Sequence, residues 1–253
     1  MKISAAIITY QAGPLLDRCL ATLDFCDEVV VLDQHSTDET AAICQRHGVR
    51  LEQTEWLGFG KTKQKAVDLC RNRWVLSIDS DEQVTPELRE AIMALPDQPV
   101  PAAFMVNRLS RFLGSWIHHC GWHPDWIVRL FDRERAAFDG KPVHESIEVE
   151  GSIDRLGGLL HHEAYETMPQ YIAKLDRYTT AAAEDLHARG RRIGPAGAVL
   201  RSQVAFWRMW ILQGGILDGW VGTALCLSSS FSVLSKYTKL WRLAGAPSSD
   251  KKP

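Results

Sequence analysis

Three acidic side chains follow a short apolar run in the segment WVLSIDSDEQVT, residues 74–85. Asp79 and Asp81 are separated by one residue, and Glu82 comes directly after them. Two carboxylates in this pattern at the end of a buried strand favour a Mg²⁺ or Mn²⁺ site, with substrate phosphates and water as the remaining ligands. Such a cation neutralises charge on a departing phosphate. The alternative interpretation is a solvated acidic turn that precedes the next helix.

These acids need strands to position them, and the first hundred residues alternate strand-like and helix-like patterns. The alternation predicts an α/β fold with a mostly parallel sheet flanked by helices. Ligands of such sheets bind beyond the carboxyl ends of the strands, and both Asp33 and the Asp79–Asp81 pair fall at such ends. The predicted strands cover residues 3–10, 28–33, 49–54 and 74–79, and the predicted helices cover residues 15–25, 37–48, 61–72 and 85–95.

Local signals mark the ends of two of these helices. Ser36 and Glu39 have the spacing of a capping box, and Gly48 is expected to end the helix that they open. Thr85 is expected to be the N-cap of the fourth helix, with Pro86 in its first turn.

The second half of the chain changes character twice. Residues 100–165 are irregular and rich in Trp, His and Arg, with Gly157 and Gly158 separating strand-like pieces. Residues 169–190 read as one helix, and the composition then becomes basic and Trp-rich. We therefore predict a catalytic domain over residues 1–190 and a helical appendage over residues 191–253.

Composition excludes several classes of protein. The chain has 253 residues and is 45% hydrophobic and 24% charged, a composition typical of a folded protein. Its net charge of −2 predicts no nucleic-acid partner, because binding to nucleic acid usually needs an excess of positive charge. Its 6 cysteines form no C-x-x-C pair, which is typical of reduced cytosolic thiols. The first residues, MKISAAIITYQ, are too short for a signal peptide and predict a core strand.

The order of several short segments carries a family resemblance. ITYQAGPLLDRCLATL, DEVVVLDQHSTDET and WVLSIDSDE stand at the predicted ends of strands one, two and four, and GFGKTKQKA, PDWIVRLF, VHE and a K-L-x-R-Y helix complete the series. In this order and spacing the chain resembles the family-2 glycosyltransferases over nearly its whole length. It is most similar to the bacterial lipopolysaccharide-core β-1,4-glucosyltransferase group.

This resemblance implies a GT-A fold and an activity. The protein would be an inverting hexosyltransferase that uses UDP-glucose. Its acceptor would be the inner core of lipopolysaccharide or a similar lipid-linked saccharide. One departure weakens the inference of UDP: many members carry two acids or Asp-Ser after strand two, where this chain has Asp33, Gln34 and His35.

The resemblance also implies where the donor binds. Thr9 and Tyr10 would lie against the nucleotide base, and Asp33 would hold the base or the ribose. Lys63 would sit near the nucleotide. Arg129 would face either the diphosphate, because a guanidinium suits phosphate contact, or a structural carboxylate.

The metal ligands follow from the same motif. Asp81 would be the main ligand of Mg²⁺ or Mn²⁺, with Asp79 nearer the ribose and also a candidate ligand. His162 would add a metal or phosphate contact, or would be a structural histidine.

Inversion also needs a base on the face of the sugar opposite the metal, which excludes the D-x-D acids. The segment GKPVHES supplies His144 and Glu145 after a turn. Adjacent residues on an extended chain point to opposite faces, so only one of them is expected to face the acceptor. Glu145 is the first candidate, His144 is the second, and a structural role for the pair is the alternative.

The appendage poses a membrane question. Residues 191–242 carry seven basic residues and four tryptophans against one acid, Asp218. Residues 216–234 are long enough to span a bilayer, but Asp218 and four serines make them a poor spanning helix. We expect interfacial attachment to an anionic membrane surface, at the cytoplasmic face of the bacterial inner membrane. The alternative is helices packed on the catalytic domain.

Two other functions compete with sugar transfer. DSDEQV resembles the nucleophile loop of haloacid-dehalogenase-like phosphatases, but it follows the fourth strand, and Gln83 stands in place of a threonine. The other rival is a non-catalytic saccharide- or membrane-binding module, which would consume no nucleotide sugar.

Overall fold

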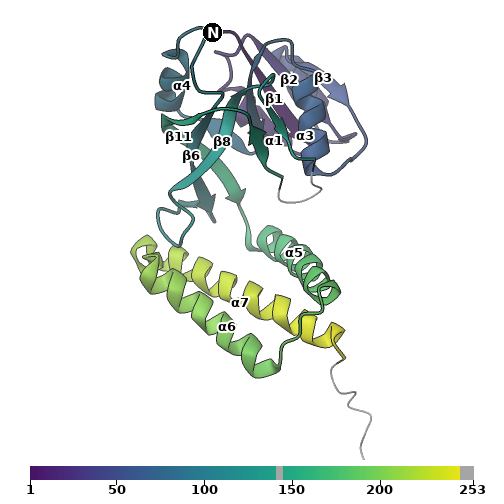
Figure 1. Cartoon of the computed structure of the whole chain (residues 1–253), viewed down its shortest axis with the longest axis vertical. Coiled ribbons are helices and arrows are strands. Elements are labelled where there is room, and N and C mark those ends of the chain that lie inside the picture. The colour runs from purple at the N-terminus through teal and green to yellow at the C-terminus, as the bar shows by residue number, and fades with distance from the viewer. Residues whose placement is uncertain (141–144, 246–253) are drawn as a thin grey trace, which may run out of the picture. The chain divides into compact units, whose positions relative to one another are not determined.

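A computed structural model describes residues 1–140 and 145–245 (Figure 1). The strands are β1 (Ile3–Thr9), β2 (Glu28–Asp33), β3 (Arg50–Gln53), β4 (Trp74–Asp79), β5 (Glu82–Val84), β6 (Ala103–Phe112), β7 (Ser115–Trp116), β8 (Asp125–Asp132), β9 (Ala136–Phe138), β10 (Ile147–Val149) and β11 (Ile153–Tyr165). The helices are α1 (Gly13–Leu20), α2 (Thr40–His47), α3 (Phe59–Asp68), α4 (Pro86–Met93), α5 (Met168–Ala188), α6 (Pro195–Trp207) and α7 (Gly219–Leu243), with two short turns, η1 (Arg208–Leu212) and η2 (Gly215–Asp218).

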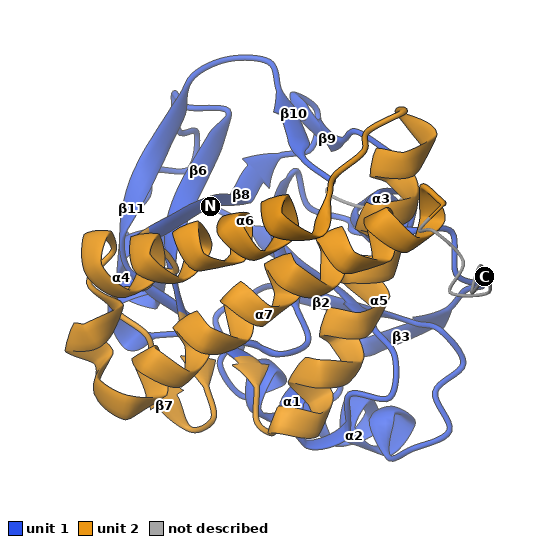
Figure 2. Cartoon of the chain, turned by 90° about the horizontal axis from the view of Figure 1, so that it is seen from below, with its two compact units in different colours: residues 1–109, 125–163 blue, residues 110–124, 164–253 orange. Residues whose placement is uncertain are grey.

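The chain divides into two compact units (Figure 2). Unit 1 comprises residues 1–109 and 125–163, and unit 2, which we call the helical unit, comprises residues 110–124 and 164–253. This division differs from the predicted boundary after residue 190. The reason is that α5 packs against α7, so the helix over residues 169–190 belongs with the appendage.

The sheet confirms the predicted parallel core. Among the described residues its strand order is β3-β2-β1-β4-β8-β6-β11-β5, with β7 paired to β6. The first four strands in that order are parallel, whereas β8 runs antiparallel to β4 and β6 runs antiparallel to β8. The predicted strands at 28–33 and 74–79 coincide with β2 and β4.

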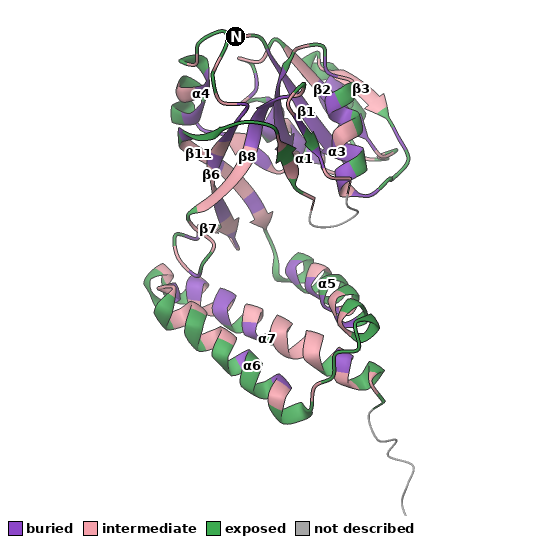
Figure 3. Ribbon diagram, viewed as in Figure 1, coloured by how far each residue is buried: buried purple, intermediate pink, exposed green. Residues whose placement is uncertain are grey.

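Both faces of the parallel strands are covered, as their unbroken apolar runs require. Alternate residues of β1 point to opposite faces. Ile3, Ala5 and Ile7 pack with residues of α1, α2 and α4, whereas Ala6 and Ile8 pack with residues of α3. Figure 3 shows the resulting burial of β1 and β2. A rigid sheet therefore carries whatever side chains follow its strand ends.

The helix-end predictions were right in two cases and wrong in one. Gly48 ends α2 in the left-handed conformation, and the Thr85 hydroxyl accepts a hydrogen bond from the Leu88 amide as N-cap of α4. The capping box of Ser36 and Glu39 does not form, because α2 begins at Thr40 without a side-chain cap. Ser36 instead serves the end of β2, as described below.

The prediction that Gly157 and Gly158 separate two strands is wrong. Both lie inside the single long strand β11. Gly158 has φ +82°, and a Cβ there would collide with the backbone nitrogen of Leu88 in α4. The glycine therefore lets β11 pass against the first turn of α4, where the Leu159 amide also donates to the Thr85 hydroxyl.

We expect Gly158→Ala to lower the free energy of unfolding by about 2 kcal/mol, because it adds both backbone strain and a steric clash. Gly157→Ala is the matched control, since a Cβ at that position meets nothing within 4 Å. Denaturant unfolding of the two variants checks the difference. Equal stabilities would show that β11 and α4 do not touch in this way.

Candidate active site

The carboxyl ends of three neighbouring strands bring the predicted site residues to one edge of the sheet. Thr9 at the end of β1 pairs in register with Asp33 at the end of β2, and Ile8 pairs with Asp79 at the end of β4. Thr9 is buried, and its hydroxyl has no hydrogen-bond partner within the described chain. Tyr10, the next residue, is 61% exposed. This edge thus offers a buried hydroxyl and an open aromatic ring.

Tight turns hold the first two strand ends together. Asp33 accepts hydrogen bonds from the Ser36 amide at 2.9 Å and from its hydroxyl at 2.5 Å. The Gln11 amide donates to the same hydroxyl oxygen at 2.8 Å. Gln11 and His35 both have positive φ, at 51° and 58°. Non-glycine residues in this conformation are strained, and such strain is concentrated at functional sites.

A buried ion network surrounds the first acid of the D-x-D motif. Lys63 Nζ lies 2.8 Å from Asp79 Oδ1 and 2.9 Å from Glu145 Oε1, so one lysine bridges two carboxylates from distant segments. Arg129 Nη2 lies 2.6 Å from both Asp79 Oδ2 and Glu82 Oε1. Lys63, Arg129 and Glu82 are all buried. Four elements therefore meet at the end of β4.

The network holds Asp79, Lys63 and Arg129 in their charged forms. Burial raises the pKa of Asp79, but the charges of Arg129 and Lys63 outweigh burial and hold that pKa well below its usual range. Burial likewise acts to lower the pKa values of Lys63 and Arg129, yet the neighbouring carboxylates raise both above their ordinary values. Asp79 is therefore a carboxylate with a cation on each oxygen.

Arg129 lies against two carboxylates at the end of β4. Its guanidinium faces the carboxylates of Asp79 and Glu82, which is the structural alternative. Sequence reasoning missed Glu82 as the centre of this arrangement. Glu82 accepts a hydrogen bond from the Asp79 amide at 3.0 Å and lies 3.4 Å from Arg108 Nη1. The third acid of DSDE thus shapes the turn that presents the other two.

We expect Arg129→Met to lower the free energy of unfolding by about 3 kcal/mol, because it removes the 2.6 Å partner of the buried Glu82 carboxylate and leaves it the longer 3.4 Å contact to Arg108. Adding Glu82→Gln should recover part of that loss, since the second change removes the charge. A double-mutant cycle from denaturant unfolding measures both effects. A stability of Arg129→Met equal to that of the unaltered protein would contradict the ion network.

The second acid of the motif has a different environment. The Asp81 side chain is 31% exposed, and its Oδ2 lies 3.5 Å from His162 Nε2. Within residues 1–140 and 145–245, no three His, Cys, Asp or Glu side chains form a metal-binding group. The partly exposed Asp81 carboxylate beside His162 fits Mg²⁺ or Mn²⁺ in a substrate-completed site, which needs only one or two protein carboxylates. Asp81 and His162 suit a metal site of this kind better than Asp79, because the two carboxylate oxygens of Asp79 already contact Lys63 and Arg129.

Of the two candidate bases, the structure describes Glu145 but not His144. Glu145 is partly buried and is joined through Lys63 to the end of β4. His144 lies outside the described residues. The structure therefore brings Lys63, Asp79, Arg129 and Glu145 into one network, with Asp81 and His162 as a pair beside the same turn.

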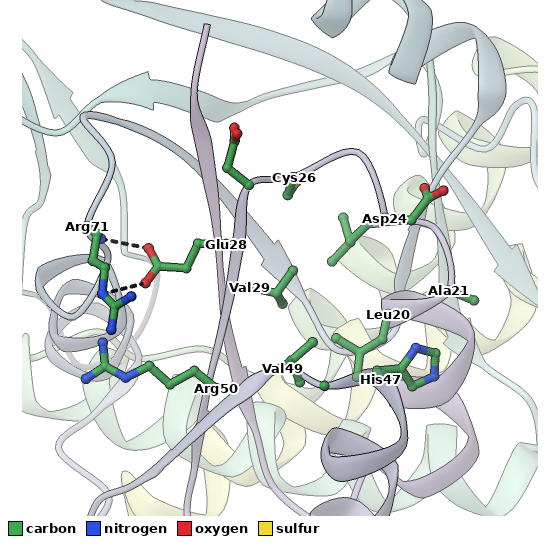
Figure 4. Close-up of a pocket in the computed structure, with 13 residues that line it drawn as sticks. Leu20, Ala21, Asp24, Cys26, Glu28, Val29, His47, Val49, Arg50 and Arg71 are labelled. Carbon is green, nitrogen blue, oxygen red and sulfur yellow. Dashed lines mark hydrogen bonds and ion pairs between the residues drawn. The ribbon is translucent and has the colours of Figure 1, made fainter.

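A pocket of about 680 Å³ lies at the other edge of the parallel strands (Figure 4). Glu28 and Val29, which begin β2, line it together with His47 and Gly48 at the end of α2. Glu28 accepts a hydrogen bond from the Arg71 amide at 2.7 Å. None of the predicted site residues lines this pocket, so its chemistry is separate from the strand-end site.

Comparison with known protein families identifies the family to which this chain belongs. Residues 4–150 match the model of Glycosyl transferase family 2. The chain is 29% identical over 230 residues to the lipopolysaccharide core biosynthesis glycosyltransferase LpsC of Rhizobium meliloti, covering 85% of this chain and 82% of that protein. It is 27% identical to an uncharacterized glycosyltransferase of Rickettsia typhi, covering 94% of this chain and 87% of that one.

Comparison with solved structures bears on the fold. A mannosyltransferase from Pyrobaculum calidifontis, solved in complex with GDP-Man and Mn²⁺, superposes with a TM-score of 0.54. The two chains are 14% identical, and the superposition covers 94% of this chain and 86% of that one. The likeness confirms the predicted GT-A fold.

Proposed function

Because this chain belongs to glycosyltransferase family 2, we propose that it is an inverting hexosyltransferase that moves glucose from UDP-glucose onto a lipid-linked saccharide. The observation that carries the proposal is the convergence at one sheet edge. Thr9, Asp33 and Asp79 end three neighbouring strands, and Lys63 links Asp79 to Glu145. A nucleotide sugar contains a base, a ribose and a diphosphate, and this edge offers a group suited to each.

Each part of the donor has a proposed partner. The uracil base lies against Thr9 and Tyr10, and the ribose lies near Asp33 and Asp79. The buried Lys63 ammonium stands close to the diphosphate. Arg129 acts on the donor indirectly, because it holds Asp79 in place through its 2.6 Å contact.

Asp81, with His162 beside it, would hold Mg²⁺ or Mn²⁺. When bound, that cation neutralises charge on the diphosphate. The Mn²⁺ in the Pyrobaculum mannosyltransferase supports the choice of metal. The main contribution of the chain is a fixed carboxylate at the turn after β4, oriented by the backbone hydrogen bond from the Glu163 amide to the Asp81 carbonyl.

Glu145 is the proposed base. The acceptor hydroxyl attacks the anomeric carbon, its proton passes to the Glu145 carboxylate, and the bond to the diphosphate breaks with the electron pair leaving on oxygen. General-base assistance of this kind typically contributes about 10²–10⁴-fold. Glu145 pairs with Lys63 at 2.9 Å. Donor phosphates that attract Lys63 would leave the Glu145 carboxylate available to the acceptor.

The acceptor proposal rests on likeness. LpsC is a lipopolysaccharide core biosynthesis glycosyltransferase, and it matches most of this chain. We therefore propose the inner core of lipopolysaccharide, or a similar lipid-linked saccharide, as acceptor. Such an acceptor is anchored in a bilayer, so we also propose that the enzyme acts at the cytoplasmic face of the bacterial inner membrane.

The phosphatase alternative finds no support in the site. It requires Asp79 as a nucleophile, whereas both oxygens of Asp79 contact cationic side chains. The non-catalytic alternative also conflicts with membership of an enzyme family.

A thermal-shift screen tests the donor. UDP-glucose, UDP-galactose, UDP-N-acetylglucosamine and GDP-mannose are each added with and without Mn²⁺. At 100 times its Kd a ligand stabilises by about 2.7 kcal/mol, which raises Tm by about 5–10 °C in a domain of this size. We expect that rise for UDP-glucose with Mn²⁺. No rise with any nucleotide sugar would overturn the proposal, and a rise with GDP-mannose alone would overturn the choice of UDP.

A further inference from the structure

An apolar stripe runs along the exposed side of α6. Leu200, Val204 and Trp207 follow one another at spacings of four and three residues, which places them on one face of α6, and Ile211 of η1 comes four residues later. All four are at least half exposed. A helix that packs in a soluble protein buries such a stripe. The exposed stripe of α6 is therefore expected to be covered by a binding partner outside the described chain.

The stripe continues into the turns and the next helix. Leu212 in η1 is 82% exposed, and Leu217 in η2 is 71% exposed. Trp220 in α7 is 78% exposed, and Leu227 and Phe231 are also exposed. Large apolar side chains in this number, on consecutive elements of one unit, exceed the scattered exposure of an ordinary surface. We call α6, η1, η2 and the first half of α7 the apolar face.

The charge around this face is almost entirely positive. Asp218 is the one acidic residue in the sequence from 191 to 245. Its carboxylate lies 2.8 Å from His119 Nδ1 and accepts a hydrogen bond from the His119 amide. Of the seven basic residues in that stretch, Lys239 is held by Asp176 and by the hydroxyls of two threonines of α5. The remaining six outnumber the one acid of this stretch, which is itself paired with His119.

Three of these cations stand at an apolar groove between α6 and α7. The groove has a volume of about 580 Å³, and its lining includes Leu200, Val204, Arg201, Arg208 and Lys236. Arg201 and Lys236 both lie over the ring of Tyr237, at 5.3 Å and 4.7 Å from its centroid. An apolar groove edged by fixed cations is complementary to a molecule that is apolar at one end and anionic at the other.

The packing of α7 distinguishes a helix that lies on a membrane from one that spans it. Residues 215–243 are long and apolar enough to cross a bilayer by length and composition. Yet other sides of α7 are tied into its own unit, one against α6 and another against α5. Ser230 donates a buried hydrogen bond to the Ser202 carbonyl of α6 at 2.9 Å, and Lys239 is bound to α5. Crossing a bilayer would break these contacts, whereas lying in the interface preserves them.

We propose that the helical unit docks on an anionic phospholipid bilayer through its apolar face, with α6 and α7 in the plane of the interface. The apolar side chains enter the boundary between head groups and acyl chains. Arg201, Arg208 and Lys236 contact lipid phosphates at the groove. This inference is independent of sugar transfer, because the helical unit contains none of the proposed site residues.

Vesicle co-sedimentation of the full chain tests the proposal. The vesicles are phosphatidylcholine alone, or phosphatidylcholine with one third phosphatidylglycerol. At about fivefold for each basic residue near the surface, the three groove cations predict binding on the order of 100-fold tighter to the anionic vesicles. Binding should weaken at 1 M salt, where the Debye length is about 3 Å.

Matched variants separate the two contributions. Leu212→Ser with Trp220→Ser should weaken binding at least about tenfold, whereas Val100→Ser, which removes an equally exposed apolar side chain of unit 1, should not. Arg201→Gln with Arg208→Gln should weaken binding about 30-fold, whereas Lys2→Gln with Lys61→Gln should not.

Four results would overturn the proposal. The first is equal binding to neutral and anionic vesicles at every salt concentration. The second is a Leu212→Ser, Trp220→Ser variant that binds as tightly as Val100→Ser. Retention on vesicles after an alkaline carbonate wash would identify a spanning helix. A dimer that those two apolar substitutions disperse, without vesicle binding, would assign the face to a second copy of the chain.

Discussion

Asp81→Ala is expected to reduce glucose transfer on the order of 10³-fold or more while leaving the fold intact. A bound divalent cation supplies several kcal/mol of charge stabilisation to a departing phosphate, and each 1.4 kcal/mol is about tenfold in rate. The Asp81 side chain is 31% exposed, and its ion pair to His162 is long, at 3.5 Å, so its removal should change the free energy of unfolding by less than about 1 kcal/mol.

Two measurements and one control make this prediction specific. Calorimetric titration with UDP-glucose should show that Mn²⁺ tightens donor binding to the unaltered protein but not to Asp81→Ala. Asp24→Ala removes a partly exposed acid near the opposite edge of the sheet and should leave both the rate and the Mn²⁺ effect unchanged. Most of the activity surviving in Asp81→Ala, in the presence of a chelator, would refute the metal assignment.

Glu145→Gln is expected to lower kcat by about 10²–10⁴-fold, the loss typical of removing a general base. Donor affinity should change little. The amide keeps the shape of the side chain, and its oxygen still accepts from Lys63, which lies 2.9 Å from Glu145 Oε1. Stopped reactions over a range of donor concentrations separate kcat from KM, and calorimetry measures donor Kd.

Other variants separate a base from a structural partner of Lys63. Lys63→Met removes the bridge to both Asp79 and Glu145, and we expect it to weaken donor binding. If Glu145 only positions Lys63, Glu145→Gln should resemble Lys63→Met and raise donor Kd with it. Near-normal turnover in Glu145→Gln, together with an inactive His144→Ala, would transfer the base role to His144.

The parallel core could be predicted from the sequence because it depends on local pattern. The apolar runs of β1, β2 and β4 and the spacing of Thr85, Pro86 and Gly48 act within one or two turns of chain. Two predictions failed because distant partners decide the local structure. Ser36 has capping-box spacing, but Asp33 and Gln11 use its side chain. Gly158 reads as a break, but α4 packs against it.

The site residues likewise differ in whether local sequence pattern could predict them. The strand-end acids followed from the order of elements, since carboxyl ends of parallel strands meet at one edge. The pairing of Arg129 with Asp79 and Glu82 joins residues 47 and 50 positions apart. No local pattern encodes that contact. The three acids of DSDE were the only signal, because a buried acid requires a buried cation, and Arg129 is one of several arginines that could have supplied it.

The most direct test of the account is the transfer reaction itself. The protein is incubated with UDP-glucose, Mn²⁺ and lipopolysaccharide that is truncated in its inner core. Mass spectrometry detects an added hexose, and proton NMR gives its anomeric configuration. We predict one added glucose in the β configuration, because an α-linked donor is inverted. A product with the α configuration, or no consumption of any nucleotide sugar, would contradict the account.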